Sequence, residues 1–150
     1  MREEVTNHVL LGTQRHGRLA DRFRNGGDDL GVPSLRSAPP SQFGGPGDQW
    51  PPETLLVAAI ADCYVLTFRA VARASKLAWV SLGCEVQGTL DRVERVTRFT
   101  EFRVRASLRV PPGTDEERAR RLLARAEQSC LITNSLEATS HLEATVETVP

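Results

Sequence analysis

The residue with the clearest chemical potential is the cysteine at position 63, in the middle of the apolar stretch "PPETLLVAAIADCYVLTFRA". A thiolate is a nucleophile, whereas a neutral thiol is a small apolar side chain. Burial among leucine, alanine and isoleucine raises the pKa of a thiol, so a reactive Cys63 requires a cation from elsewhere in the chain. Arginine suits that role because it stays charged at low dielectric. Two interpretations are open: Cys63 fills a core, or it is a nucleophile.

Three other residues bear on this choice. Cys130 follows Cys63 by 67 positions and can meet it only through tertiary folding. Glu53 precedes Cys63 by ten residues, nearly three helical turns, so it cannot contact the thiol directly. It either holds the arginine or only complements a helix dipole. Cys84 alternates with polar residues and is interpreted as a core residue.

The composition excludes several classes of function. The three histidines (His8, His16 and His141) lie far apart and none neighbours a cysteine, so we expect no metal site. With 19 basic and 19 acidic residues interleaved, the net charge is zero, and neither nucleic acid nor an anionic membrane is an expected partner. The N-terminus has no apolar core of signal-peptide length, and the longest purely apolar run, Leu55 to Ala61, is too short to span a bilayer. These features predict a cytoplasmic protein.

The first half of the chain predicts short strands and one long helix. Strands are expected over Val5 to Leu11 and Leu19 to Arg24, and a short one over Val32 to Arg36, within a stretch rich in glycine and proline. Pro52 suits the first position of a helix that continues to about Ala74. Apolar side chains occupy its whole circumference, which predicts a central, buried helix.

The second half predicts a sheet and a surface helix. Two segments alternate apolar and polar residues, Val80 to Leu90 and Phe102 to Val110, as half-buried antiparallel strands do. Thr114 and Glu117 have the spacing of a capping box at the start of a helix that ends shortly before Cys130. A helical turn within residues 133–138 and a strand over 141–149 follow. The element order indicates one α+β domain over residues 1–150, and the arginines among residues 92–125 are expected on an ion-paired, solvated face.

The stretch "PPETLLVAAIADCYVLTF" resembles the "NPE-x-L-x-x-A-x-x-x-C" signature of the OsmC/Ohr family of osmotically induced and organic-hydroperoxide-resistance proteins. Around it, "FGGPGDQW" matches the family's glycine-rich loop, and "QRHGR" its "R-x-G" turn. The segment "AEQSCLITNSLEA" resembles the family's "A-x-x-x-C-P-x-S-N". This chain departs from the pattern at Pro51 in place of asparagine, at Asp62 in place of a small residue, and at Leu131 in place of proline.

The resemblance implies a fold, a dimer and a set of catalytic residues. The expected fold is OsmC-like, with antiparallel sheets packed around the long central helix of an intertwined homodimer. Cys63 would be the peroxidatic cysteine and Cys130 the resolving one, and Glu53 would anchor a catalytic arginine. Arg15 is the first candidate for that arginine, Arg18 the second and Arg22 the third.

Two functions follow as hypotheses. The first is a cysteine-based peroxidase that reduces organic hydroperoxides through a Cys63 sulfenic acid and a Cys63–Cys130 disulfide. The resemblance implies a dithiol reductant, possibly of the dihydrolipoamide type, and neither a metal nor a bound organic cofactor. The alternative is an OsmC-like protein without a peroxidase cycle that binds a small apolar or electrophilic ligand. A pKa of Cys63 above about 8.5 would favour the second hypothesis.

Overall fold

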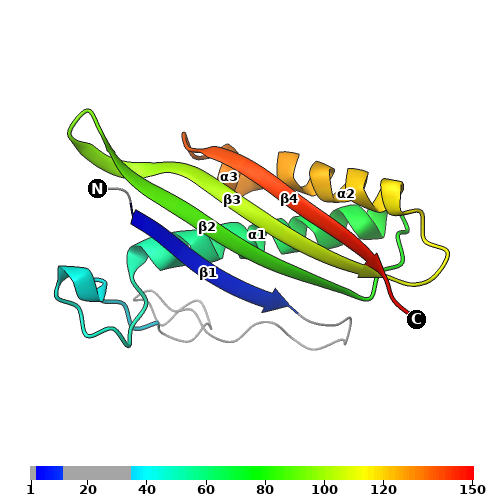
Figure 1. Ribbon diagram of the computed structural model, residues 1–150, viewed down its shortest axis with the longest axis horizontal. Helices are drawn as coiled ribbons and strands as arrows, with labels where there is room; N and C mark the ends of the chain where they lie inside the picture. Colours follow the sequence, from blue (N-terminus) through cyan, green and yellow to red (C-terminus); the bar gives the residue numbers. More distant parts are fainter. Residues whose placement is uncertain (1–2, 12–34) are drawn as a thin grey trace, which may run out of the picture. The chain divides into compact units, whose positions relative to one another are not determined.

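The structure is a computed structural model that describes the backbone of residues 3–11 and, with their side chains, residues 35–150 (Figure 1). The chain divides into two compact units, Met1–Gln14 with Leu56–Pro150, and Arg15–Leu55, and each is described separately below. The expected strand over Leu19 to Arg24 and all three candidate arginines lie outside the described residues. The single domain over residues 1–150 stays a prediction.

The first unit contains one four-stranded sheet in the order β1-β2-β3-β4. The strands are β1 (Glu3–Leu11), β2 (Ser81–Val93), β3 (Val96–Val110) and β4 (Thr139–Thr148). The pairs β1–β2 and β2–β3 are antiparallel, as predicted, but β3 and β4 are parallel. The prediction of antiparallel sheets is therefore wrong for the last pair. Two helices connect β3 to β4, and such a crossover returns the chain to the end of the sheet at which β3 began.

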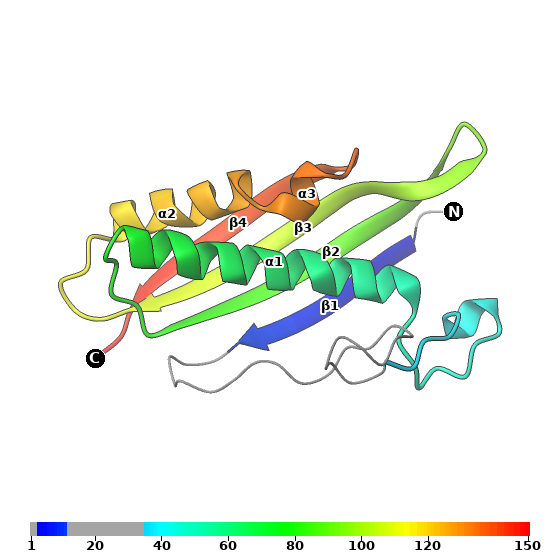
Figure 2. The ribbon, with the colours of Figure 1, turned by 180° about the vertical axis from the view of Figure 1, so that it is seen from behind.

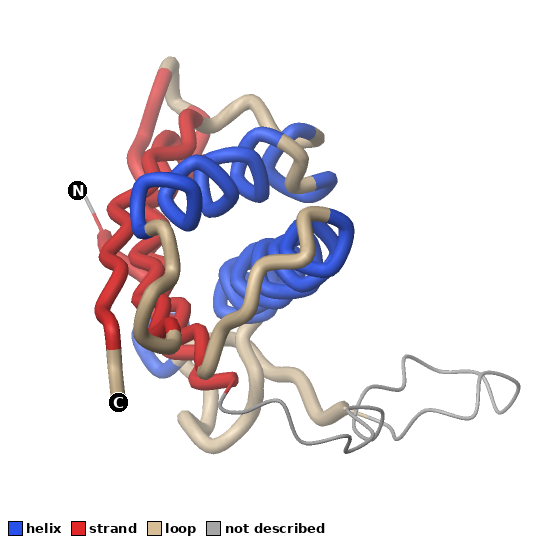
Figure 3. The backbone as a smooth tube through the Cα atoms, turned by 90° about the vertical axis from the view of Figure 1, so that its right-hand side faces the viewer, coloured by secondary structure: helices blue, strands red, loops and turns tan. Residues whose placement is uncertain are grey.

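The sheet has one apolar and one charged face, as the alternation predicts. Leu82, Val104 and Leu108 are each 1% exposed and contribute to the core. On the opposite face the Arg105 guanidinium lies 3.2 Å from Glu85 and 3.0 Å from Glu143, across both neighbouring strands. Both long helices lie on the apolar face (Figures 2 and 3). The predicted ion-paired face is thus confirmed for β3. The opposite side of the sheet forms the core, and the site lies on that side.

Helix α1 spans Pro52–Ala74, the predicted bounds, and packs one side of its surface on the sheet. The buried residues of α1 are Val57, Ile60, Ala61, Tyr64, Val65, Phe68 and Ala72. The opposite side of the same helix is exposed at Ala59, Asp62, Leu66, Arg69, Ala70 and Arg73. By length and composition alone, α1 could also cross a membrane. Of its most apolar 18-residue segment, 39% is buried inside this chain. The prediction of burial around the whole circumference is therefore not met within one chain, because the single sheet covers only one side.

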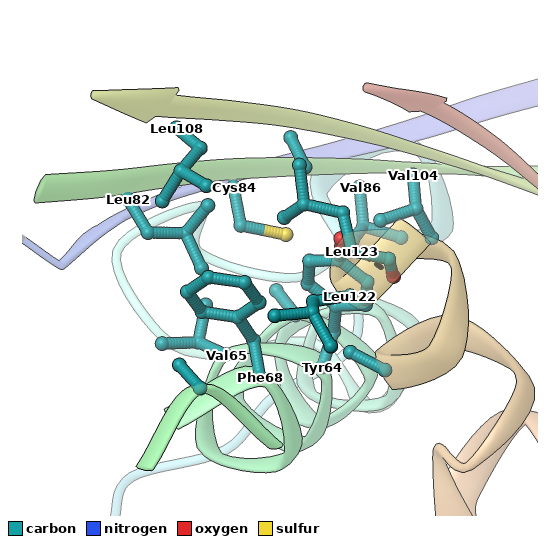
Figure 4. Close-up of a cluster of buried hydrophobic side chains, with 14 of the residues drawn as sticks. Tyr64, Val65, Phe68, Leu82, Cys84, Val86, Val104, Leu108, Leu122 and Leu123 are labelled. Atoms are coloured by element: carbon teal, nitrogen blue, oxygen red, sulfur yellow. Dashed lines mark hydrogen bonds between the residues drawn. The ribbon is translucent and has the colours of Figure 1, made fainter. Parts of the chain in front are cut away.

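Helix α2 (Glu116–Gln128) lies beside α1 and closes the core (Figure 2). Its Leu122 and Leu123 point toward Tyr64 and Phe68 in the core (Figure 4). The Tyr64 hydroxyl donates a hydrogen bond to the Leu123 carbonyl oxygen at 3.4 Å. This bond satisfies a buried polar group at the junction of the two helices.

The start of α2 differs from the prediction by one residue. Asp115 is the N-cap, and its carboxylate accepts a hydrogen bond from the Arg118 N–H at 2.9 Å. The Thr114 hydroxyl instead donates to the Pro111 carbonyl oxygen at 2.7 Å. The predicted capping box of Thr114 with Glu117 is therefore wrong: the turn after β3 occupies the hydroxyl, and a carboxylate suits the positive end of the helix dipole.

In the second unit, the described residues form a short loop structure and the first turn of α1. Ser37 forms an isolated bridge with Trp50, and Ser41–Phe43 forms a single 3-10 turn, η1. Leu35 and Arg36, the described end of the strand predicted over Val32 to Arg36, are not in a strand. The chain then enters α1 at Pro52, which has no N–H to leave unsatisfied in the first turn.

Candidate functional site

The fold brings Cys63 and Cys130 together. Cys63 lies on α1, and Cys130 is the N-cap of α3 (Leu131–Asn134). The chain turns sharply after α2, with the Cys130 N–H donating to the Glu127 carbonyl oxygen at 3.1 Å. The Cys130 carbonyl oxygen then accepts from the Asn134 N–H at 3.1 Å and begins α3. The two thiols are hydrogen-bonded to each other, so residues 67 positions apart in the chain form one site.

Several donors converge on the Cys63 sulfur. The backbone N–H groups of Ile132 and Leu131, at the first positions of α3, hydrogen-bond to it. These amides have no carbonyl partner inside the helix, so they are free to bind an anion. The Thr67 hydroxyl donates from one helical turn further along α1. The sulfur therefore lies in a set of neutral donors that favours its charged form.

The two thiols of the site have opposite pKa shifts. Burial raises the pKa of Cys63, but the hydrogen bonds from Ile132, Cys130, Thr67 and Leu131 outweigh it, and the net pKa lies below the ordinary value of 9.0. Burial raises the pKa of Cys130, which is only 1% exposed, and its negative neighbour Cys63 raises it further. Of the two thiols, Cys63 is therefore the one that ionises first, and Cys130 is the thiol that donates to it.

Cys84 belongs to the core and not to the reacting pair. It is 3% exposed and projects from β2 among Leu82, Leu108 and Phe68 (Figure 4). Burial raises its pKa to about 12. The prediction that this cysteine is a packing residue is confirmed.

Glu53 lies in the second unit, in the first turn of α1. Its Oε2 atom is buried and has no hydrogen-bond partner among the described residues. A pocket of about 480 Å³ adjoins it, lined by Ser37, Ala38, Pro39, Pro40, Phe43 and Pro52. A buried carboxylate oxygen without a partner is costly, so the site suits a cation. The structure does not test the predicted arginine, because Arg15, Arg18 and Arg22 lie outside the described residues.

Two features of the site were missed at the level of sequence. Thr67 follows Cys63 by four residues, a spacing that places both on one helix face, so the sequence did contain this signal. The donors at Leu131 and Ile132 are backbone N–H groups, so the residue types at these positions do not predict them. Asp62 is exposed, and its neighbour Cys63 is half-buried, so the acidic residue next to the thiol points to solvent.

Within residues 35–150 no group of three or more histidine, cysteine, aspartate or glutamate side chains is placed to hold a metal ion. The groups of the described site that can react are its two thiols. A half-buried thiolate, in contact with a buried thiol, can be oxidised and then form a disulfide with its neighbour.

Known proteins share this fold. An organic hydroperoxide resistance protein from Elizabethkingia anophelis superposes with a TM-score of 0.64 at 23% identity, over 81% of this chain and 85% of that one. An OsmC-like protein of unknown function from Vibrio cholerae gives a TM-score of 0.61 at 23% identity, over 67% and 68% of the two chains. At this identity the likeness establishes the fold alone.

Sequence comparison identifies the family. The uncharacterized protein YmaD of Bacillus subtilis is 26% identical over 107 residues, which cover 69% of this chain and 71% of that one. The family profile described as "OsmC-like protein" matches residues 45–145, a range that includes Glu53, Cys63 and Cys130. The chain therefore belongs to the OsmC/Ohr family of OsmC-like proteins.

Proposed function

We propose that this protein is a thiol-dependent peroxidase that reduces organic hydroperoxides with Cys63. The observation that carries the proposal is the contact between Cys63, whose pKa is lowered, and the thiol of Cys130. Some members of the family reduce hydroperoxides, and relatives of the same fold are named organic hydroperoxide resistance proteins. The pair of thiols is the arrangement that such a reaction requires.

In the first step, the Cys63 thiolate attacks the outer oxygen of the hydroperoxide. The O–O bond breaks, the alkoxide takes a proton and leaves as alcohol, and Cys63 becomes a sulfenic acid. The lowered pKa increases the fraction of Cys63 that is thiolate at a given pH. Among the described residues, the groups that lower this pKa are neutral hydrogen-bond donors.

In the second step, the Cys130 sulfur attacks the sulfenic sulfur of Cys63. A disulfide forms and water leaves, with the thiol proton of Cys130 going to the departing oxygen. Cys130 is already hydrogen-bonded to Cys63, so only a local movement is needed. An external dithiol, which we propose is of the dihydrolipoamide type, then reduces the disulfide and is itself oxidised.

Exposed apolar side chains favour organic over hydrogen peroxide as substrate. Leu66, three residues after Cys63 on α1, is 48% exposed, and Leu131, next to Cys130, is 71% exposed. Ala59, four residues before Cys63, is also exposed. These side chains offer an organic substituent an apolar surface that hydrogen peroxide cannot use.

We further propose that the protein is a homodimer and that Glu53 holds an arginine. The exposed face of α1 extends beyond these apolar residues to Ala70, which a second copy of the chain would cover. The Oε2 atom of Glu53, which has no partner within the described part of the chain, would accept a guanidinium hydrogen bond. Arg15 is the first candidate for that guanidinium, with Arg18 and Arg22 as the others.

The peroxidase proposal is tested with cumene hydroperoxide and dihydrolipoamide, in the wild type, Cys63→Ser and Cys130→Ser. We expect no consumption above background with Cys63→Ser. With dihydrolipoamide left out, Cys130→Ser should consume one equivalent and accumulate a sulfenic acid at Cys63, detectable by dimedone addition and mass spectrometry. Undiminished turnover in Cys63→Ser would refute the proposal. A wild type that consumes no peroxide would refute it too, and would favour a ligand-binding protein.

A further inference from the structure

Asn134, the last residue of α3, reaches back across Cys130 to the end of α2. Its side-chain Nδ2 donates a hydrogen bond to the Gln128 carbonyl oxygen at 2.9 Å. We propose that Asn134 is a positioning residue that holds Cys130 in the orientation from which it pairs with Cys63. The inference rests on the proposed function for the pairing of the two cysteines, and it goes beyond that function in giving Asn134 a role.

The Gln128 carbonyl oxygen needs a donor from outside α2. Gln128 is the last residue of that helix, and the carbonyl groups of a last turn have no N–H partner inside their own helix. The carbonyl before it, that of Glu127, accepts from the Cys130 N–H at 3.1 Å. The Asn134 amide supplies the donor for Gln128. This bond closes residues 128–134 into a ring, here named the Cys130 turn.

The backbone of Cys130 is also held on its carbonyl side. The Cys130 carbonyl oxygen accepts two hydrogen bonds, from the Asn134 N–H at 3.1 Å and from the Thr133 hydroxyl at 3.2 Å. Leu131 stands where the family signature has proline, so no proline ring fixes the φ angle at that position. The conformation of the turn therefore depends on hydrogen bonds. Within the described part of the chain, Asn134 makes the one side-chain hydrogen bond that joins α3 to α2.

The Cys130 turn directs its cysteine into the molecule. Cys130 is 1% exposed, whereas Asn134 is exposed on the outside of the turn. The helix that carries the turn is anchored beside Cys63, because the Tyr64 hydroxyl of α1 donates to the Leu123 carbonyl oxygen of α2 at 3.4 Å. One hydrogen bond thus fixes α2 next to α1, and the Asn134 bond fixes the turn on α2.

A thiol exchange reaction tests the position of Cys130 without peroxide. Oxidised glutathione first forms a mixed disulfide with Cys63. The Cys130 thiolate then attacks the Cys63 sulfur, the bond to glutathione breaks, and glutathione leaves and takes up a proton. The concentration of reduced glutathione at which the mixed disulfide and the Cys63–Cys130 disulfide are equal measures how often Cys130 lies within reach of Cys63. Mass spectrometry of the intact protein and its peptides quantifies both species.

We expect Asn134→Ala to lower this concentration about 3- to 10-fold, the contribution of one hydrogen bond. Cys63 is already bonded to glutathione in this step, so the stability of its own thiolate does not enter the result. Asn134 is exposed, and its truncation leaves no cavity in the core. A residue that only stabilised the fold would lower the unfolding temperature and leave the concentration unchanged.

Ser135→Ala is the matched control in the same segment. The Ser135 hydroxyl donates to the Leu131 carbonyl oxygen at 2.7 Å, a bond at the end of α3 that does not reach α2. Its loss should leave the glutathione concentration within about twofold of the wild type. The two variants each remove one hydrogen bond from neighbouring exposed residues, so their difference isolates the bond to α2.

A glutathione concentration unchanged in Asn134→Ala, or lowered equally in Ser135→Ala, would overturn the inference. A wild type that forms no disulfide between Cys63 and Cys130 would overturn it as well. If Asn134→Ala does not fold, as judged by thermal unfolding, Asn134→Leu is measured instead, because it has a similar shape and no donor. A wild type without peroxide turnover, in which Asn134→Ala still lowers the concentration, would refute the peroxidase and leave the inference standing.

Discussion

Cys63 and Cys84 are the same residue type in two regions of one unit, and their chemistry is opposite. Cys84 lies between the sheet and the helices, where burial raises its pKa to about 12. Cys63 lies between α1 and α3, where the burial effect is outweighed and the pKa falls below its ordinary value. Burial opposes ionisation at both thiols but is more complete at Cys84, and of the two only Cys63 has hydrogen-bond donors that lower its pKa.

The difference shows what converts a core cysteine into a nucleophile. The surroundings of Cys84 are apolar side chains from β2, β3 and α1. Cys63 instead faces the start of a helix, where the first backbone amides have no partner within the helix. The apolar stretch around Cys63 does not activate the thiol. It positions Cys63 beside the residues that do.

The largest expected effect separates the two cysteines directly. Cys63→Ser should lower the rate of cumene hydroperoxide reduction by on the order of 1,000-fold or more, because it removes the nucleophile. Cys84→Ala should leave that rate within about twofold and destabilise the fold by about 1 kcal/mol, through loss of a buried side chain. Peroxide consumption and urea unfolding measure the two effects. A loss of turnover in Cys84→Ala, with the fold intact, would show that Cys84 is needed for the reaction and is not only a packing residue.

A smaller effect tests the backbone donors around Cys63. Leu131 is the first residue of α3, a position where proline fits well because its N–H is not needed by the helix. Leu131→Pro therefore removes the amide that faces Cys63, and should slow alkylation of Cys63 at pH 7 about 3-fold. Leu131→Ala keeps the amide and serves as the control. Equal rates in the two variants would show that the amide does not stabilise the thiolate.

The smallest expected effect is on stability as pH changes. The folded pKa of Cys84 is raised, so its contribution to stability is complete below the unfolded value near 9.0 and declines as pH rises toward about 12. The folded pKa of Cys63 is lowered, so its contribution is present above 9.0 and is lost as pH falls through the folded value. When the pH is raised from 8 to 10, the wild type should lose stability relative to Cys84→Ala and gain stability relative to Cys63→Ser. Urea unfolding curves at each pH measure the two differences in the free energy of unfolding between the wild type and each variant. If both differences changed in the same direction with pH, the opposite pKa shifts of the two thiols would be wrong.

Much of the fold could be predicted from periodicity. The bounds of α1 follow from Pro52 and an uninterrupted helical run, and the alternation in β2 and β3 shows which face is buried. The parallel pairing of β3 with β4 could not be predicted, because strand direction depends on the connection and not on the strand. The burial of only one side of α1 could not be predicted either, because apolar residues around a whole helix do not show which other elements cover each side.

The residues of the site likewise include some that the sequence predicts and some that it does not. Cys63, Cys130 and Glu53 could be identified by type and spacing once the signature around them was matched. The Ile132 and Leu131 donors could not, since any residue carries a backbone N–H and only the start of α3 directs these two at the sulfur. Whether Arg15, Arg18 or Arg22 enters the site stays a prediction.

The titration of Cys63 decides whether its surroundings stabilise the thiolate. Thiolate absorbance near 240 nm is followed against pH in the reduced wild type and in Cys63→Ser, and the difference isolates the ionisation of Cys63. The account predicts a midpoint below the ordinary value of 9.0 for Cys63. A midpoint at or above that value would contradict it, because Cys63 would then be a buried thiol like Cys84.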